Sequence, residues 1–174
     1  MNLAERILQE HSKKQKNRIV SYVGHDPKRF SELVDVFLQG PYSITQRAAW
    51  PLSFCIEQYP DLLKPHFKKI LGKLGEKNIH NSVKRNTLRM LQFVRVPKVY
   101  QGITVDLCLP FLADAKEPVA IRVFAMTVMA NIAKEVPELK NELIPLIEDH
   151  IPYASAGFIS RSGKVLKQLR INPK

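Results

Sequence analysis

The chain of 174 residues has only two cysteines, Cys55 and Cys108, and they lie 53 positions apart. Both fall inside apolar stretches with helical spacing, where a reduced thiol acts as a small buried hydrophobic side chain. A disulfide framework is not expected, because small disulfide-stabilised domains carry many more cysteines.

Glycine is also scarce, with seven in the whole chain. No glycine-rich phosphate loop, His-x-x-x-His pair, Cys-x-x-Cys pair or serine elbow occurs. The five histidines are scattered and mostly adjoin turns or charged residues: His11, His25, His66, His80 and His150. We therefore expect no catalytic residues, no metal site and no small-molecule cofactor.

Long apolar runs are absent as well. The first ten residues include Glu5 and Glu10, and no stretch approaches the length of a signal peptide or a membrane span. Hydrophobic residues make up 45% of the chain and charged residues 25%, which is the composition of a folded domain. We expect one soluble, cytoplasmic domain over residues 1–174, with no membrane partner.

The net charge of +11 is unevenly distributed along the chain. Residues 61–100 contain ten Lys or Arg against two Asp or Glu, and residues 151–174 contain five against none. Between them, residues 101–150 are acidic, with four basic against eight acidic residues. Concentrated positive charge is compatible with an anionic partner, and equally with a basic surface that only keeps the protein in solution.

Four segments resemble one another, and each has an arginine near the start of an amphipathic run. These arginines are Arg47, Arg85, Arg122 and Arg161, at spacings of 38, 37 and 39 residues. A second set of apolar runs alternates with them, at residues 30–38, 62–74, 103–112 and 143–147. The pattern predicts a repeat of two helices.

A two-helix repeat of this length resembles the HEAT and armadillo families. The best match is residues 112–125, where Asp114 is followed by the pair Ile121-Arg122 and then by Ala125. The resemblance implies an all-α, right-handed superhelix of about four helix pairs over residues 26–170, with capping helices in residues 1–25. It gives Asp114 and Arg122 a structural role in a ladder between neighbouring repeats.

Helix boundaries follow from local signals. Asp26 before Pro27 is typical of an N-cap, and Ser43 and Ser82 are expected to cap the second helices of their repeats. Breaks are predicted at Gly40-Pro41, Tyr59-Pro60, Val96-Pro97, Glu117-Pro118 and Val136-Pro137. Three further prolines fall within expected helices and should bend them: Pro51, Pro110 and Pro145.

The helix expected to begin near Ser43 has a core face and, nearly opposite, a second, partly aromatic stripe that includes Ser43 itself. Its core face contains Ile44, Ala48, Leu52, Cys55, Ile56 and Tyr59. On the other side lie Arg47, Trp50 and Phe54, and the corresponding positions one repeat later are Asn86, Arg89 and Phe93. This second face serves either packing between repeats or binding of a partner, since arginine and tryptophan dominate binding hot spots.

Basic residues form clusters that differ in their expected position. Lysines 13, 14 and 16 with Arg18, and lysines 64, 68, 69, 73 and 77, are expected on solvated surface. Lys84, Arg85 and Arg89 are expected near the inner face of the repeats. Arg161, Lys164 and Lys167 share one side of the last helix.

Two functions are compatible with these features. The first is a non-enzymatic scaffold that binds an acidic protein or peptide along its inner face. The expected contacts are Arg47, Trp50, Phe54, Lys84, Arg85, Arg89, Arg161, Lys164 and Lys167. The alternative is nucleic-acid binding, because the positive charge and helical repeats also resemble the alkylpurine DNA glycosylases. No catalytic residue is carried over from that family, since Phe54 stands one turn after Trp50 where an acid would be needed.

Overall fold

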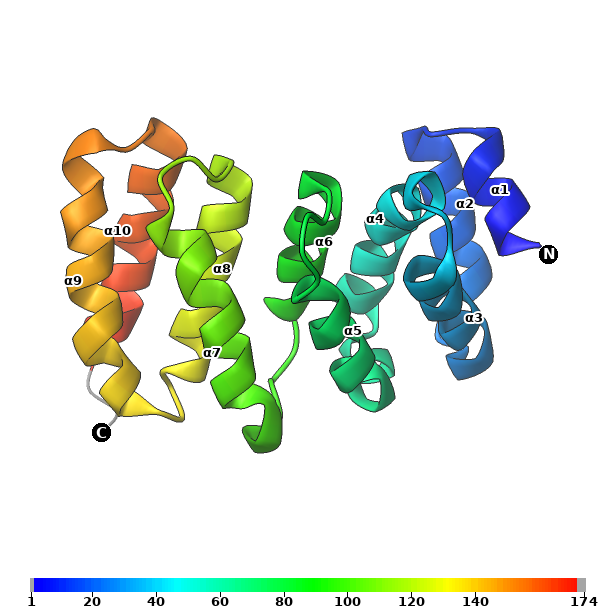
Figure 1. Ribbon diagram of the computed structural model, residues 1–174. Helices are drawn as coiled ribbons and strands as arrows, with labels where there is room; N and C mark the ends of the chain where they lie inside the picture. The colour runs from blue at the N-terminus through cyan, green and yellow to red at the C-terminus, as the bar shows by residue number, and fades with distance from the viewer. Residues whose placement is uncertain (1, 172–174) are drawn as a thin grey trace. The chain divides into compact units, whose positions relative to one another are not determined.

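The computed structural model describes residues 2–171, and its regular structure is entirely helical, with no strand in that range. Figure 1 shows these helices as coiled ribbons, coloured from blue at the N-terminus to red at the C-terminus. The α-helices are α1 (Leu3–Gln9), α2 (Lys13–Val23), α3 (Pro27–Gln39), α4 (Tyr42–Gln58), α5 (Phe67–Leu74), α6 (Asn81–Leu91), α7 (Lys98–Ala113), α8 (Val119–Ile132), α9 (Lys140–His150) and α10 (Ala156–Arg170). Three 3₁₀ segments join them, at Pro60–His66, Pro137–Leu139 and Ile151–Tyr153.

The helices form four pairs after two N-terminal helices, which confirms the helical-repeat prediction. The pairs are α3 with α4, α5 with α6, α7 with α8, and α9 with α10, so each arginine-bearing segment is the second helix of its pair. The right-handed twist of the superhelix stays a prediction.

The chain divides into two compact units, Met1–Val94 and Arg95–Lys174. In the first unit, α4 packs against α3, α6 and α2 around the fully buried side chains of Phe30, Phe37, Leu52, Ile56 and Leu88. In the second, α8 packs against α7 and α10 around Leu112, Ala125, Met126 and Phe158. A single domain over residues 1–174 stays a prediction.

The proline breaks all fall between helices, and Pro51, Pro110 and Pro145 all lie inside helices, as the sequence indicates. Asp26 caps α3, because its Oδ1 accepts hydrogen bonds from the amides of Lys28 and Arg29 at 2.8 and 3.2 Å. Local proline and capping signals therefore locate these helix boundaries.

Two capping predictions are wrong. The N-cap of α4 is Pro41, and Ser43 lies inside the first turn. The proline ring fixes φ at residue 41, so the helix begins two residues earlier than a Ser43 cap would require. The N-cap of α6 is His80, whose Nδ1 accepts from the amide of Ser82 at 3.0 Å and lies 2.7 Å from its hydroxyl oxygen. An imidazole nitrogen thus takes the place that a hydroxyl was expected to fill.

Helix α8 is enclosed on almost every side, as its composition predicts. Its Arg122 is also buried, and its Nε donates to the carbonyl of Leu112 at 3.1 Å. The guanidinium lies 4.4 Å from the centre of the Phe158 ring on α10, while Asp114 accepts from the amide of Lys116. Arg122 therefore joins α7, α8 and α10, and burial lowers its pKa against the opposing effect of Asp114.

Candidate functional site

A groove of about 400 Å³ opens in the first unit between the turn after α1, the helix α4 and the start of α6. It is lined by His11, Gln46, Arg47, Trp50, His80, Ser82, Arg85 and Asn86. Of the residues predicted to bind a partner, the groove brings together Arg47, Trp50 and Arg85. No acidic residue is among these eight.

Arg47 and Trp50 lie one turn apart on α4, and both side chains are partly exposed. The Nη1 of Arg47 donates to the carbonyl of Leu8 at 3.1 Å, near the end of α1. The indole of Trp50 has its ring centre 5.4 Å from that of His11, at an angle of 56°. Arg47 thus helps to hold α1 against α4, while Trp50 forms an aromatic wall of the groove.

Arg85 and Lys84 belong to the first two turns of α6. Arg85 is exposed and lines the groove beside the capping residues His80 and Ser82. Lys84 is partly buried. Because peptide dipoles concentrate partial positive charge at a helix N-terminus, this end of the groove favours negatively charged groups.

Phe54 lies beside the groove and is held between two cations. The Nζ of Lys16 is 3.6 Å from the centre of its ring, and the guanidinium carbon of Arg89 is 4.1 Å from the same centre. Arg89 also lies 5.3 Å from the ring of Phe93, and Lys16 lies 5.9 Å from Trp50. A layer of alternating cations and aromatic rings therefore runs from α2 across α4 to α6.

Arg89 is already engaged within the protein. Its Nη2 is paired with the carboxylate of Glu57, and its Nη1 lies 3.4 Å from the carbonyl oxygen of Ser53. The side chain retains 18% of its accessible surface. These contacts give Arg89 a packing role between α4 and α6, and its binding to an outside partner stays a prediction.

Lys16 differs from what its cluster predicts, because it is buried while Lys13, Lys14 and Arg18 are exposed. Burial lowers the pKa of its ammonium, and the nearby charges of Lys13 and Arg89 lower it further. The sequence does contain a signal for this burial. Lys16 stands three and seven residues before the buried Ile19 and Val23, on the apolar face of α2.

Arg161, Lys164 and Lys167 belong to α10 of the second unit. Arg161 is partly buried and donates from Nη1 to the hydroxyl of Thr127 on α8 at 2.8 Å. Lys164 and Lys167 are exposed, and the buried Val165, Leu166 and Leu169 occupy the opposite side of the helix. The expected separation of basic and apolar sides on this helix is therefore present.

The two thiols are poorly suited to nucleophilic chemistry. Both cysteines are free and buried, and burial raises the pKa of each to about 12. Residues 2–171 also contain no group of three or more His, Cys, Asp or Glu side chains placed to hold a metal ion. The chemistry that the groove offers is hydrogen bonding and ion pairing through guanidinium and imidazole groups, with an indole as an apolar surface.

Within the same range, none of the helices has the length and run of apolar residues that spanning a bilayer requires. In a comparison with known protein families, the family model of a HEAT repeat domain matches residues 3–169, which is nearly all of the chain. A search of curated proteins gave no match.

Proposed function

The chain belongs to the HEAT repeat family, and on that premise we propose that it is a non-enzymatic scaffold whose groove between α4 and α6 binds an acidic protein or peptide segment. Helical repeats present long ridged surfaces that suit extended partners. The proposal locates the protein in the cytoplasm, where reduced thiols such as Cys55 and Cys108 persist.

The observation that carries the proposal is the composition of the groove. Arg47 and Arg85 project from different helices into one groove that also contains Trp50. Arginine presents a planar fork of donors that matches a carboxylate, and tryptophan supplies a large apolar surface at low entropic cost. An acidic segment with one apolar side chain near its carboxylates fits this combination.

Phe54 and Arg89 join the helices that form the groove. The layer that they form with Lys16 keeps the second helices α4 and α6 at a fixed separation, so that the groove exists before the partner arrives. Lys84 on α6 is proposed as a further contact for negative charge beside the groove. Arg161, Lys164 and Lys167 on α10 of the second unit are proposed as a separate set of contacts for negative charge. A preformed groove reduces the ordering that binding requires.

The test uses three fluorescent probes: an eight-residue peptide of alternating Glu and Leu, its Lys-Leu counterpart, and a 20-base-pair DNA duplex. We expect the acidic peptide to bind, and Trp50→Ala or Arg85→Glu to weaken its binding at least tenfold. Lys69→Glu is the matched control, since Lys69 is an exposed lysine on α5. It should change the affinity by less than about twofold, because exposed charges are weakly coupled to a distant site.

The DNA arm separates the two functions considered from the sequence. If duplex DNA binds more tightly than the acidic peptide, and Arg85→Glu abolishes that binding, the groove is a nucleic-acid site and the proposal is wrong. Its affinity would then fall with salt, with a slope of about −0.9 per phosphate contact.

A further inference from the structure

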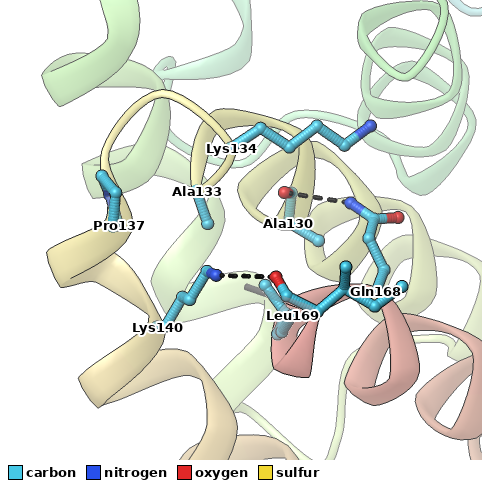
Figure 2. Close-up of a pocket in the computed structure, with 8 residues that line it drawn as sticks. Ala130, Ala133, Lys134, Pro137, Lys140, Gln168 and Leu169 are labelled. Atoms are coloured by element: carbon cyan, nitrogen blue, oxygen red, sulfur yellow. Dashed lines mark hydrogen bonds between the residues drawn. The ribbon is translucent and has the colours of Figure 1, made fainter. Parts of the chain in front are cut away.

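A second hollow lies in the other compact unit, where the end of α8, the start of α9 and the end of α10 meet. It has a volume of about 260 Å³ and is drawn in Figure 2. Five of its lining residues are aliphatic: Ala130, Ala133, Pro137, Leu169 and Ile171. The other three are Lys134, Lys140 and Gln168.

The polar wall of this pocket is already hydrogen-bonded. The Nε2 of Gln168 donates to the carbonyl of Ala130 at 3.1 Å, so the amide ties α10 to α8. The Nζ of Lys140 lies 3.5 Å from the carbonyl oxygen of Ile171. Figure 2 shows both bonds as dashed lines. The two helix-end carbonyls that would repel an anion are therefore covered by donors.

The two lysines carry the positive charge of the pocket. In Figure 2, Lys134 and Lys140 extend on either side of the methyl groups of Ala130 and Ala133. Their hydrogen bonds run to neutral oxygens: Lys134 donates to Oδ1 of Asn131 at 3.1 Å, and Lys140 makes the long contact to Ile171. The nearby acid Glu135 is paired with Arg95 at 2.7 Å. Both ammonium groups can therefore gain by meeting a carboxylate.

The size of the pocket decides what kind of carboxylate fits. A volume of 260 Å³ is below the range of about 300–1,000 Å³ typical of sites for drug-sized ligands, and it suits one large aliphatic side chain. Because both lysines belong to the lining itself, a carboxylate close to that side chain lies within reach of their ammonium groups. In a polypeptide, an apolar side chain and a carboxylate share one residue only at the C-terminus.

We propose that this pocket binds the C-terminal residue of a partner peptide, with an aliphatic side chain against Ala130, Ala133 and Leu169 and the terminal carboxylate between Lys134 and Lys140. The site is separate from the groove of the first unit, and the inference does not rest on the function proposed for that groove.

The experiment is a methyl NMR titration of the full chain with labelled alanine, leucine and isoleucine. The main probe is acetyl-Gly-Ser-Gly-Leu with a free carboxylate. Its comparisons are the same peptide with a C-terminal amide, acetyl-Gly-Ser-Gly-Gly, and 4-methylpentanoate. We expect saturable shifts of the Ala130, Ala133 and Leu169 methyl groups with the first probe, and at least tenfold weaker binding of the amide and of the glycine peptide. 4-Methylpentanoate carries both recognised groups without a peptide bond, and therefore distinguishes a peptide C-terminus from a free aliphatic acid.

Lys140→Gln and Lys134→Gln should each weaken the binding of the leucine peptide by about fivefold, which is the upper range for the loss of one partly exposed ion pair. Lys116→Gln is the matched control, since Lys116 is an exposed lysine before the opposite end of α8. It should leave the affinity unchanged. The probe comparisons on the wild-type protein need no variant, so a misfolded variant cannot obscure the result.

Each other outcome overturns the proposal. Equal binding of the amide would show an apolar pocket without carboxylate recognition. Equal binding of 4-methylpentanoate would identify a site for free aliphatic acids. Absence of shifts with about 10 mM leucine peptide, a concentration that reveals dissociation constants in the millimolar range, would mean that the pocket binds no C-terminus.

Discussion

The ammonium of Lys16 on α2 lies 3.6 Å from the centre of the Phe54 ring on α4, and the two residues are 38 positions apart in the chain. The lysine retains 7% of its accessible surface. A cation this close to an aromatic face gains electrostatic energy from the ring, and the gain increases when water is excluded. The pair therefore fixes α2 on α4, at the cost of a desolvated charge.

The pH dependence of stability should reveal this cost. Since burial depresses the pKa of Lys16, the unfolded chain binds its proton more tightly than the folded chain does. The contribution of this residue to stability therefore increases as the pH rises from the lowered pKa of the folded state toward the ordinary lysine pKa of 10.5. Lys16→Met keeps the length of the side chain and removes the titration.

The measurement is urea unfolding of both proteins between pH 7 and pH 10.5, with the difference in free energy taken at each pH. The wild type should gain relative to Lys16→Met as the pH increases. The exposed Lys14→Met serves as the control and should show no such trend. A constant difference between wild type and Lys16→Met would mean that Lys16 is as well solvated when folded as when unfolded.

Arg89 should contribute to stability more than its position on a basic helix suggests. Arg89→Ala removes the ion pair with Glu57 and the contacts with Phe54 and Phe93, and should cost about 1–3 kcal/mol. Lys69→Ala removes an exposed pair with Asp35 at 4.0 Å and should cost less than about 0.5 kcal/mol. A double-mutant cycle of Arg89→Ala with Glu57→Gln should give a coupling energy above about 0.5 kcal/mol. If the two effects were additive, the pair with Glu57 would contribute nothing to stability, and Arg89 would be available to bind a partner.

Replacing glycine by alanine should change stability in opposite directions at two positions. A Cβ at Gly40 would lie 2.6 Å from the carbonyl oxygen of Val36 and 2.9 Å from a methyl carbon of Ile44, so Gly40→Ala must displace the start of α4. It should destabilise the protein by about 1–3 kcal/mol. A Cβ at Gly72 meets nothing within 4 Å, and Gly72→Ala in α5 should stabilise it by about 0.5–1 kcal/mol. Thermal unfolding measures both, and a stable Gly40→Ala would show that the turn between α3 and α4 has room to adjust.

Local signals in the sequence were sufficient for most of the fold. The spacing of Arg47, Arg85, Arg122 and Arg161 correctly located four second helices, because helix periodicity and proline breaks depend on neighbours in the chain. Ser43 is not the N-cap because Pro41, whose ring fixes φ, occupies that position two residues earlier. Local sequence preferences therefore identify an element more reliably than its terminal residue.

The site was predicted less completely, because its contacts join distant parts of the chain. Arg47, Trp50 and Arg85 line one groove, and their role in binding a partner stays a prediction. The pairing of Arg89 with Glu57 spans 32 positions and leaves no local signature. Lys16 was assigned to the surface by residue type, although its spacing from Ile19 and Val23 marked the buried face. The lysine-flanked pocket near Ala133 depends on three helix ends and has no sequence pattern at all.

The enclosure of α8 makes a further prediction about the second unit. Ala125 has no accessible surface, so Ala125→Asp places a carboxylate without a partner in the core and should cost several kcal/mol. Ala115→Asp, in the exposed turn before α8, should change stability by less than about 0.5 kcal/mol. Calorimetry measures the melting temperatures of both variants. A melting temperature of Ala125→Asp within a degree or two of wild type would contradict the assignment of Ala125 to an enclosed position of its repeat.

The central claim is that the groove between α4 and α6 binds an acidic protein segment, and photocrosslinking in the native cell tests it most directly. A photoreactive amino acid replaces Gln46 inside the groove or, as the control, the exposed Glu32 on α3. The claim predicts a discrete adduct from position 46 that protease removes and nuclease does not, and that is lost when Arg85→Glu is added. A nuclease-sensitive adduct, or equal adducts from positions 46 and 32, would contradict it.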